Sequence, residues 1–190
     1  MRISGGKARG IELKVPKGDR VRPATDGLRQ SVFSSLAAAI PGARFLDLFA
    51  GSGAYGLEAF SRGATGGLFV ERDARAAACI RQNIEAVARS VGAIGAADLS
   101  VTQADALQIA AAPPGPVPDL VFIDPPYEII PEVAPMLFER LTSLFAGRPS
   151  AIVVFELPGE LNLAPAGWSL VKRLGKGARQ PTAAFFRPKP

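Results

Sequence analysis

The chain has 190 residues, 48% of them hydrophobic, and its 22 Lys and Arg against 17 Asp and Glu give a net charge of +5. This composition predicts one globular domain, and the absence of a hydrophobic leader or of an apolar run near the roughly 18 residues of a membrane helix predicts a cytoplasmic protein without membrane contact. One cysteine and no histidine exclude an internal disulfide framework and remove the usual metal ligand, so we expect chemistry without a metal.

The first predicted element is a glycine-rich β-hairpin over residues 1–15. A connector rich in Pro, Gly and Arg follows over 16–24. We therefore expect 1–24 to be a small basic extension and 25–190 to be the main domain.

A helix is predicted to begin at Thr25 or Asp26, since either side chain can cap it, and to end at Ile40 before Pro41 and Gly42. Its expected buried face is an apolar stripe at helical spacing. The stripe consists of Leu28, Val32, Leu36 and Ile40.

Beyond this helix, short apolar strands alternate with helical segments, which predicts a parallel, doubly wound α/β sheet with right-handed crossovers. After Pro165 two strands follow each other without a helix, which predicts an antiparallel hairpin closing the sheet. The strands are predicted near 44–49, 67–71, 99–103, 119–123, 150–156, 168–174 and 182–187, and the helices near 54–62, 74–91 and 128–146.

A glycine loop follows the first strand of this alternation. Gly51, Gly53 and Gly56 fit the pattern G-x-G-x-x-G, which suits a dinucleotide-binding fold as well as other nucleotide folds. Glu71 ends the next strand, twenty residues after Gly51, where either class would use a carboxylate on ribose hydroxyls. The glycines and Glu71 therefore predict a nucleotide-containing ligand without identifying it.

Asp47 distinguishes the two classes of ligand. A carboxylate inside the strand, four residues before the first glycine, is unfavourable beside a pyrophosphate. It is favourable beside the ammonium and sulfonium groups of S-adenosylmethionine. We therefore expect S-adenosylmethionine as the cofactor.

The apolar strand near 119–123 ends in Asp124-Pro125-Pro126-Tyr127, which are the candidate catalytic residues. An exocyclic amino group on a nucleobase is a poor nucleophile, because its lone pair is delocalised into the ring. Asp124 and a prolyl carbonyl can accept its two N–H groups, and Tyr127 can stack on the base. The simpler interpretation is that the two prolines form a turn after a buried strand.

Basic residues gather at both ends of the chain. Residues 1–30 carry eight Lys and Arg against three acids, and residues 172–190 carry six and no acid. The middle is acidic, so we expect a polyanion to approach from the terminal segments. Either end alone could also be an ordinary solvated surface.

Five segments together resemble the bacterial 16S rRNA guanine-N2 methyltransferases of the RsmD type, and the resemblance runs from Met1 to about Arg187. The basic glycine-rich opening and the Arg22-Pro23 pair are the most specific parts, since the other motifs are shared with many amino-methyltransferases. The segments are 1–10, Arg22-Pro23, 46–53, 61–64 and 124–127.

The resemblance implies the class I methyltransferase (Rossmann-like) fold, with a mostly parallel seven-stranded sheet whose last strand is antiparallel, and an N-terminal hairpin that contacts RNA. Asp105 is then expected near the adenine amino group of the cofactor, although it could equally be a helix N-cap. The implied cofactor residues are Asp47, Gly51, Ser52, Gly53, Glu71, Arg72, Asp105 and Ala106, and the implied RNA contacts are Arg2, Lys7, Arg9, Arg22, Thr25 and Arg29. The chain departs from the family pattern at Ala24, Gly27, Gln30 and Ser34.

The predicted function is S-adenosylmethionine-dependent methylation of a guanine N2 amino group in 16S rRNA, either free or in the small subunit or its assembly intermediate, by a monomer. An adenine-N6 methyltransferase is the alternative of the same class. A protein glutamine methyltransferase is disfavoured because that family resembles Asn-Pro-Pro-Tyr. A nucleotide-dependent oxidoreductase and a catalytically inactive RNA-binding module are the alternatives outside methylation.

Overall fold

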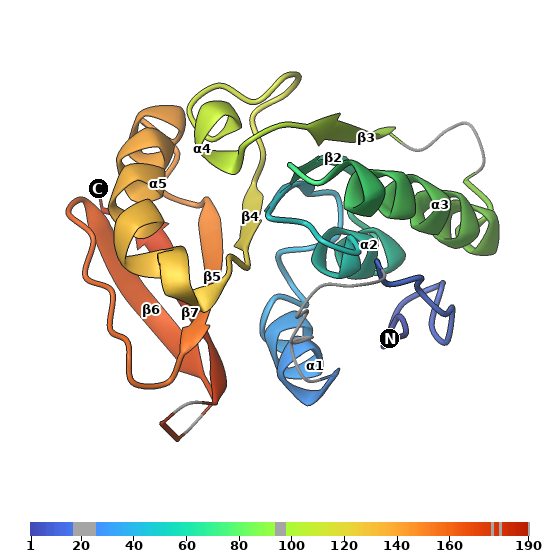
Figure 1. The fold of residues 1–190 in the computed structure, drawn as a ribbon, viewed down its shortest axis with the longest axis horizontal. Coiled ribbons are helices and arrows are strands. Elements are labelled where there is room, and N and C mark those ends of the chain that lie inside the picture. The colour runs from blue at the N-terminus through green and yellow to red at the C-terminus, as the bar shows by residue number, and fades with distance from the viewer. Residues whose placement is uncertain (17–25, 94–97, 176, 179, 190) are drawn as a thin grey trace.

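The computed structural model describes residues 1–16, 26–93, 98–175, 177–178 and 180–189 of the chain. Seven strands form one sheet in the order β3-β2-β1-β4-β5-β7-β6 (Figure 1). β1 to β5 are parallel, whereas β7 is antiparallel to both β5 and β6, which confirms the predicted closing hairpin. The strands are β1 (Arg44–Leu48), β2 (Gly66–Glu71), β3 (Asp98–Gln103), β4 (Leu120–Ile123), β5 (Ile152–Pro158), β6 (Trp168–Leu174) and β7 (Pro181–Pro188).

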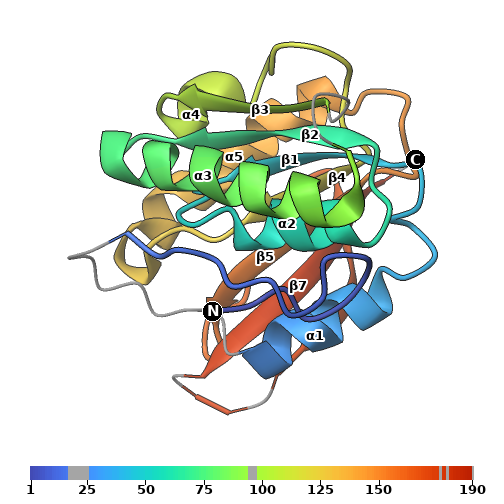
Figure 2. The same cartoon turned by 90° about the vertical axis from the view of Figure 1, so that its right-hand side faces the viewer.

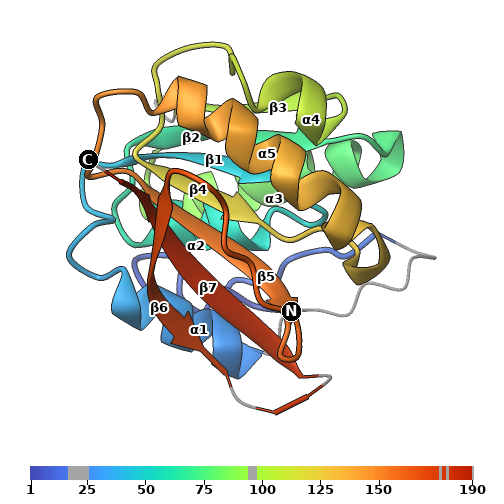
Figure 3. The ribbon, with the colours of Figure 1, turned by 90° about the vertical axis from the view of Figure 1, so that its left-hand side faces the viewer.

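Helices cover both faces of the sheet. Figure 2 shows α2 and α3 in front of the sheet, with α1 and the N-terminal segment below, and Figure 3 shows α5 and α4 on the opposite side. No helix in the described part of the chain is long and apolar enough to cross a membrane. The helices are α1 (Asp26–Ser35), α2 (Ala54–Ser61), α3 (Ala74–Val91), α4 (Ala106–Ile109), the 3₁₀ turn η1 (Tyr127–Ile129) and α5 (Ile130–Leu144).

The sheet separates two hydrophobic clusters, because alternate side chains of each strand point to opposite faces. In β1, Phe45 packs with α1, α2 and α3, whereas Leu46 and Leu48 pack with α4 and α5. Burial on both faces explains why the central strands are nearly continuous apolar runs. Asp47 lies on the same face as Phe45 and is therefore a charged group inside a hydrophobic layer.

α1 ends at Ser35, five residues before the predicted end at Ile40. Beyond Ser35 the backbone continues in tight turns, in which Ala39 N donates to Leu36 O at 2.8 Å. Pro41 disfavours helical geometry at the residue before it, so the last part of the predicted helix tightens instead of continuing. Leu36 and Ile40 remain buried, so the predicted apolar stripe is correct although the helix is shorter.

The N-terminal segment forms the predicted hairpin in a short form. Its two arms meet at one antiparallel bridge, Arg2 to Glu12, and Ile3 N donates to Ile11 O at 3.0 Å. The turn of this hairpin is held by α2, since Lys7 N donates to Ser61 O at 2.8 Å and Ala8 N donates to Ser61 Oγ at 2.9 Å. Its apolar side chains join the larger core cluster. The segment is therefore packed on the main domain, while the connector that would divide the two lies mostly outside the described residues.

A glycine in α2 sets how closely that helix approaches the sheet. A Cβ on Gly56 would lie 2.4 Å from both Phe45 Cε2 and Phe69 Cε1. We expect Gly56→Ala to lower the free energy of unfolding by about 1–3 kcal/mol, because overpacking against two buried rings outweighs the gain of about 1 kcal/mol in helix propensity. Urea denaturation measures the change. Gly27→Ala is the matched control, since nothing lies within 4 Å of its Cβ, and a stability of Gly56→Ala equal to that of Gly27→Ala would contradict the packing.

Candidate active site

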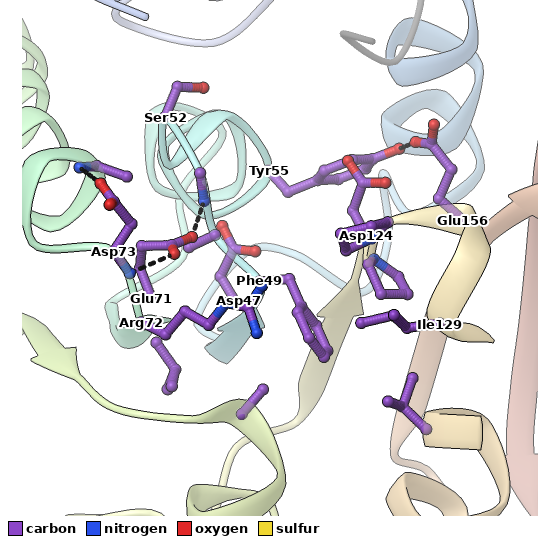
Figure 4. A pocket seen from close by; sticks show the side chains of 18 of the residues that line it. Asp47, Phe49, Ser52, Tyr55, Glu71, Arg72, Asp73, Asp124, Ile129 and Glu156 are labelled. Atoms are coloured by element: carbon purple, nitrogen blue, oxygen red, sulfur yellow. Dashed lines mark hydrogen bonds between the residues drawn. The ribbon is translucent and has the colours of Figure 1, made fainter. Parts of the chain in front are cut away.

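A cavity of about 980 Å³ opens at the carboxyl ends of the parallel strands. The strand order reverses at β1, which has β2 on one side and β4 on the other, and open α/β sheets bind ligands at such a switch point. Figure 4 shows Glu71 and Asp47 toward one end of the cavity and Asp124, Tyr55 and Glu156 toward the other. The volume is at the upper end of small-molecule sites, so a cofactor and part of a second molecule can both fit.

Most of the predicted cofactor and catalytic residues line this cavity. Gly53 does not, and the predicted RNA contacts Arg2, Lys7 and Arg9 lie outside it. Among the described residues, no group of three or more Asp, Glu, Cys or His is arranged to hold a metal ion. The predicted residues that line the cavity are Arg29, Asp47, Gly51, Ser52, Glu71, Arg72, Asp105, Ala106, Asp124, Pro125, Pro126 and Tyr127.

Glu71 is held in position by two backbone amides. Gly51 N donates to Glu71 Oε2 at 2.9 Å, and Asp73 N donates to Oε1 at 2.9 Å. Each carboxylate oxygen keeps a lone pair. The fixed carboxylate can therefore accept hydrogen bonds from vicinal hydroxyl groups of a ribose.

Asp47 is 2% exposed, and its Oδ2 accepts a hydrogen bond of 2.9 Å from Gly56 N at the start of α2. Burial raises the pKa of Asp47 to about 8, the Gly56 amide opposes this shift, and the charge of Glu71 adds to it. A buried carboxylate with an acidic neighbour favours a cationic ligand, because a positive charge restores its ionised form. This fits the ammonium and sulfonium groups that the sequence predicts here.

The glycine loop presents Gly51, and not Gly53, to the cavity. Gly51 has a φ of 55°, and the atom nearest to a Cβ built on it is Phe49 O at 4.0 Å. Gly53 has a φ of 78°, but its Cβ would point into the core, 3.2 Å from Ile80 Cγ2. Gly53, which the resemblance implies as a cofactor residue, therefore faces the core and not the cavity.

Asp105 has the predicted N-cap role and a place in the cavity wall. It caps α4, because its Oδ1 accepts a hydrogen bond of 2.7 Å from Leu107 N, and it also lines the cavity. Arg72 is exposed at the cavity rim, whereas Ala106 and Ser52 are buried in its wall. A direct contact between Asp105 and a cofactor stays a prediction.

Asp124 follows β4 and is partly exposed to the cavity. Burial, followed by the charges of Glu156 and Asp47, raises the pKa of Asp124 well above its usual range. Pro126 O already accepts a hydrogen bond from Ile129 N at 3.2 Å, so the Pro125 carbonyl is the better candidate for a second acceptor. The motif therefore brings a carboxylate and a backbone carbonyl to one corner of the cavity.

Several cavity residues were missed from the sequence, among them Glu156, Tyr55 and Phe49. Glu156 at the end of β5 is 3% exposed, and its Oε2 accepts a hydrogen bond of 2.8 Å from Tyr55 Oη. Burial raises the pKa of Glu156 to about 7, while Tyr55 and Arg29 oppose the shift. Phe49 adopts a φ of 60°, a strained conformation for a bulky residue of the kind often found at functional sites. The one available signal was a glutamate in the otherwise apolar strand run of 152–157.

Arg29 does not occupy the surface position that an RNA phosphate contact requires. It is 1% exposed, and its Nη2 donates to Arg2 O at 2.7 Å and to Asp26 Oδ1 at 2.8 Å. The long-range charge partner is Glu58, whose Oε2 lies 3.7 Å from Arg29 Nε. The burial follows from this pairing with α2, which sequence spacing did not indicate. The predicted contacts Arg22 and Thr25 lie outside the described residues.

The N-terminal segment reaches the cavity through its two ends, whereas its basic side chains do not line the cavity. Arg2, Lys7 and Arg9 are exposed, while Met1 and Pro16 of the same segment line the cavity wall. A polyanion that follows the segment from Lys7 and Arg9 to Met1 would therefore arrive at the cavity.

The seven-stranded sheet with its reversed last strand, and the cavity at its switch point, define the class I methyltransferase fold. The family model described as "Conserved hypothetical protein 95" matches residues 1–184, and the chain belongs to this family. Ribosomal RNA small subunit methyltransferase D of Escherichia coli strain K12 is 35% identical over 172 residues, which cover 90% of this chain and 82% of that protein.

Solved structures agree with the fold. The structure of yhhF from Escherichia coli superposes with a TM-score of 0.80 at 30% identity and covers 100% of this chain and 98% of that chain. An RNA methyltransferase from Salinibacter ruber in complex with S-adenosyl-L-homocysteine has a TM-score of 0.61 at 17% identity, covering 88% of this chain and 95% of that chain. At that identity the second likeness concerns the fold alone.

Proposed function

We propose that the protein is an S-adenosylmethionine-dependent methyltransferase that methylates the N2 amino group of a guanine in 16S rRNA. The observation that carries this proposal is the presence in one cavity of a cation-favouring, ribose-binding end and an acceptor corner at Asp124. The kinship with ribosomal RNA small subunit methyltransferase D supports rRNA as the substrate class.

The cavity residues fit S-adenosylmethionine group by group. Glu71 would accept from the ribose hydroxyls, Asp47 would face the cationic part, and Asp105 would lie toward the adenine. When bound, the cofactor supplies an electrophilic methyl group on sulfonium sulfur. Because Gly51 has no Cβ, the cofactor could approach the backbone of the loop closely.

Asp124 would prepare the amino group and take up its proton. Its carboxylate and the Pro125 carbonyl accept the two N–H groups, so that the nitrogen lone pair is directed toward the methyl carbon. The bound cofactor would supply the methyl group to this nitrogen, and the Asp124 carboxylate would take up the surplus N–H proton. The raised pKa of Asp124 suits this role, because a more basic carboxylate is a better proton acceptor.

Methyl incorporation tests the proposed function. Purified protein with S-adenosylmethionine carrying a labelled methyl group is incubated with small-subunit rRNA from cells that lack this gene, with DNA and with total protein. We expect label in rRNA alone. Label in DNA would favour the adenine-N6 alternative, label in protein would favour a glutamine methyltransferase, and binding of NAD(H) without any transfer would favour an oxidoreductase.

The N-terminal segment is the proposed RNA-docking surface. Changing Arg2, Lys7 and Arg9 to Gln should remove about three phosphate contacts and flatten the slope of log affinity against log salt by roughly two to three units. The loss should not depend on RNA sequence, because phosphate contacts position a protein without reading bases. Filter binding of rRNA between low and moderate salt measures the slope.

The matched control removes the same charge far from the cavity. Arg81, Arg89 and Arg148 are exposed, lie outside both basic ends of the chain and do not line the cavity, so their triple change to Gln should leave the slope near that of the wild type. Equal slopes for the two triple variants would remove the docking role from the N-terminal segment. Arg173 is a poor substitute for that role, since its Nη2 already donates to Leu161 O at 2.8 Å and to Thr182 Oγ1 at 3.0 Å.

A further inference from the structure

Beside Asp124, the cavity holds charged groups that methyl transfer alone does not require. Glu156 and Arg29 are 3% and 1% exposed, and both line the cavity. Burying an ionisable group is unfavourable unless a partner compensates for the lost water. Glu156 has a hydrogen bond from Tyr55, but Arg29 Nε and Nη1 have no hydrogen-bond partner among the described residues.

The strand register and the charge interactions place these groups in a defined order. Ile123 of β4 pairs with Phe155 of β5. The next residue of each strand, Asp124 and Glu156, therefore lies at the same level, and the two are neighbours. Glu156 interacts electrostatically with Asp124 from β4 and with Arg29 from α1. Glu156 therefore lies in the middle of a row that runs from Asp124 to Arg29, as Figure 4 shows for Asp124 and Glu156.

This row is complementary to one edge of guanine. Along its Watson–Crick edge, guanine presents the N2 amino donor, the N1–H donor and the O6 acceptor. Two carboxylates followed by a guanidinium present an acceptor, an acceptor and a donor in the same sequence. Adenine placed with its N6 amino group at Asp124 would instead turn the unprotonated N1 toward Glu156, which leaves two acceptors facing each other.

We propose that Asp124, Glu156 and Arg29 read the Watson–Crick edge of the target guanine, with Glu156 accepting from N1–H and Arg29 donating to O6. Tyr55 is a positioning residue, because its hydroxyl occupies Glu156 Oε2 and leaves Oε1 to face the base. The assignment rests on the proposed guanine-N2 activity and deepens it, since it names the residues that select guanine over adenine. Part of the charge of Arg29 is already balanced by Asp26 and Glu58, so the free Nη1 can serve the base.

Base analogues in the RNA test the row without altering the protein. An rRNA fragment that the wild type methylates is prepared with guanine, 2-aminopurine or 2,6-diaminopurine at the target position. All three bases carry the 2-amino group. 2-Aminopurine lacks both N1–H and O6. 2,6-Diaminopurine lacks them as well, and it has a 6-amino donor where guanine O6 would face Arg29. We expect kcat/KM to fall by roughly 100-fold from guanine to 2-aminopurine and further for 2,6-diaminopurine.

Glu156→Gln then tests the middle position. The amide can donate to the bare N1 of 2-aminopurine, so the preference for guanine over 2-aminopurine should shrink at least about tenfold while affinity for S-adenosylmethionine is kept. Glu132→Gln is the matched control, because Glu132 is an exposed carboxylate on the same cavity and should leave the preference unchanged. If Glu156→Gln does not fold, Glu156→Asp keeps a carboxylate and should retain the preference at a lower rate.

The outcomes separate this assignment from the proposed function. Two results would overturn the proposed reading of the guanine edge and leave guanine methylation intact. One is a wild type that methylates guanine and 2-aminopurine equally well, and the other is a Glu156→Gln variant with the wild-type preference for guanine over 2-aminopurine. Better use of 2,6-diaminopurine than of 2-aminopurine would overturn the role of Arg29. No transfer to guanine-containing rRNA by the wild type would remove the proposed function itself.

Discussion

Asp124→Ala is expected to lower the methylation rate by roughly 10²- to 10⁴-fold, the usual contribution of a positioned proton acceptor. The carboxylate lies in the acceptor corner and not at the ribose-binding end, so the affinity for S-adenosylmethionine should change by no more than a few-fold. Single-turnover kinetics with saturating cofactor measure the rate, and calorimetry measures the affinity.

Asp119→Ala is the matched control for this variant. Asp119 precedes β4 at the opposite end of the same strand, is exposed, and its Oδ2 accepts a hydrogen bond of 2.9 Å from Arg44 N. Its removal should leave the rate close to that of the wild type. A purified Asp124→Ala variant with near-wild-type turnover would contradict the assignment of Asp124.

Gly51→Val should weaken binding of S-adenosylmethionine by roughly 100-fold or more, which corresponds to at least about 2.7 kcal/mol. The Cβ and its two methyl groups would enter the open side of the loop, where the cavity is lined by Gly51 itself. A β-branched residue also adopts a φ of 55° only with strain.

Gly92→Val separates the steric effect from this strain. Gly92 caps α3 with a φ of 73°, has nothing within 4 Å of a built Cβ, and does not line the cavity. Calorimetry should show wild-type cofactor affinity for this control. A folded Gly51→Val protein that also binds S-adenosylmethionine like the wild type would show that the cofactor does not approach the loop.

The fold could be predicted because its signals are local in sequence. Apolar strands alternating with helical segments predict the parallel sheet, and the absence of a helix between β6 and β7 predicts the reversed strand. The N-terminal hairpin could be predicted too, but the contact of its turn with Ser61, more than fifty residues away, could not. Such a long-range partner leaves no periodic pattern in the segment itself.

Site residues could be predicted where a motif ends a strand, as at Asp124 and Glu71. They could not be predicted where tertiary packing determines the position of the side chain. Arg29 was expected to contact RNA from the resemblance, but its buried position depends on Glu58 in another helix. Glu156 stood inside an apolar run with no motif, although a charged residue at the end of a buried strand was a usable signal. The direction of the Gly51 and Gly53 Cβ positions depends on φ, which the glycine pattern does not give.

The most direct test of the central claim is nucleoside mass spectrometry of 16S rRNA after reaction with the purified protein. Small-subunit particles and free rRNA from cells lacking the gene are incubated with S-adenosylmethionine that carries a deuterated methyl group, then digested to nucleosides. The proposed function predicts deuterated N2-methylguanosine, absent when Asp124→Ala replaces the wild type. Label confined to N6-methyladenosine, or no label in either form of the RNA, would contradict it.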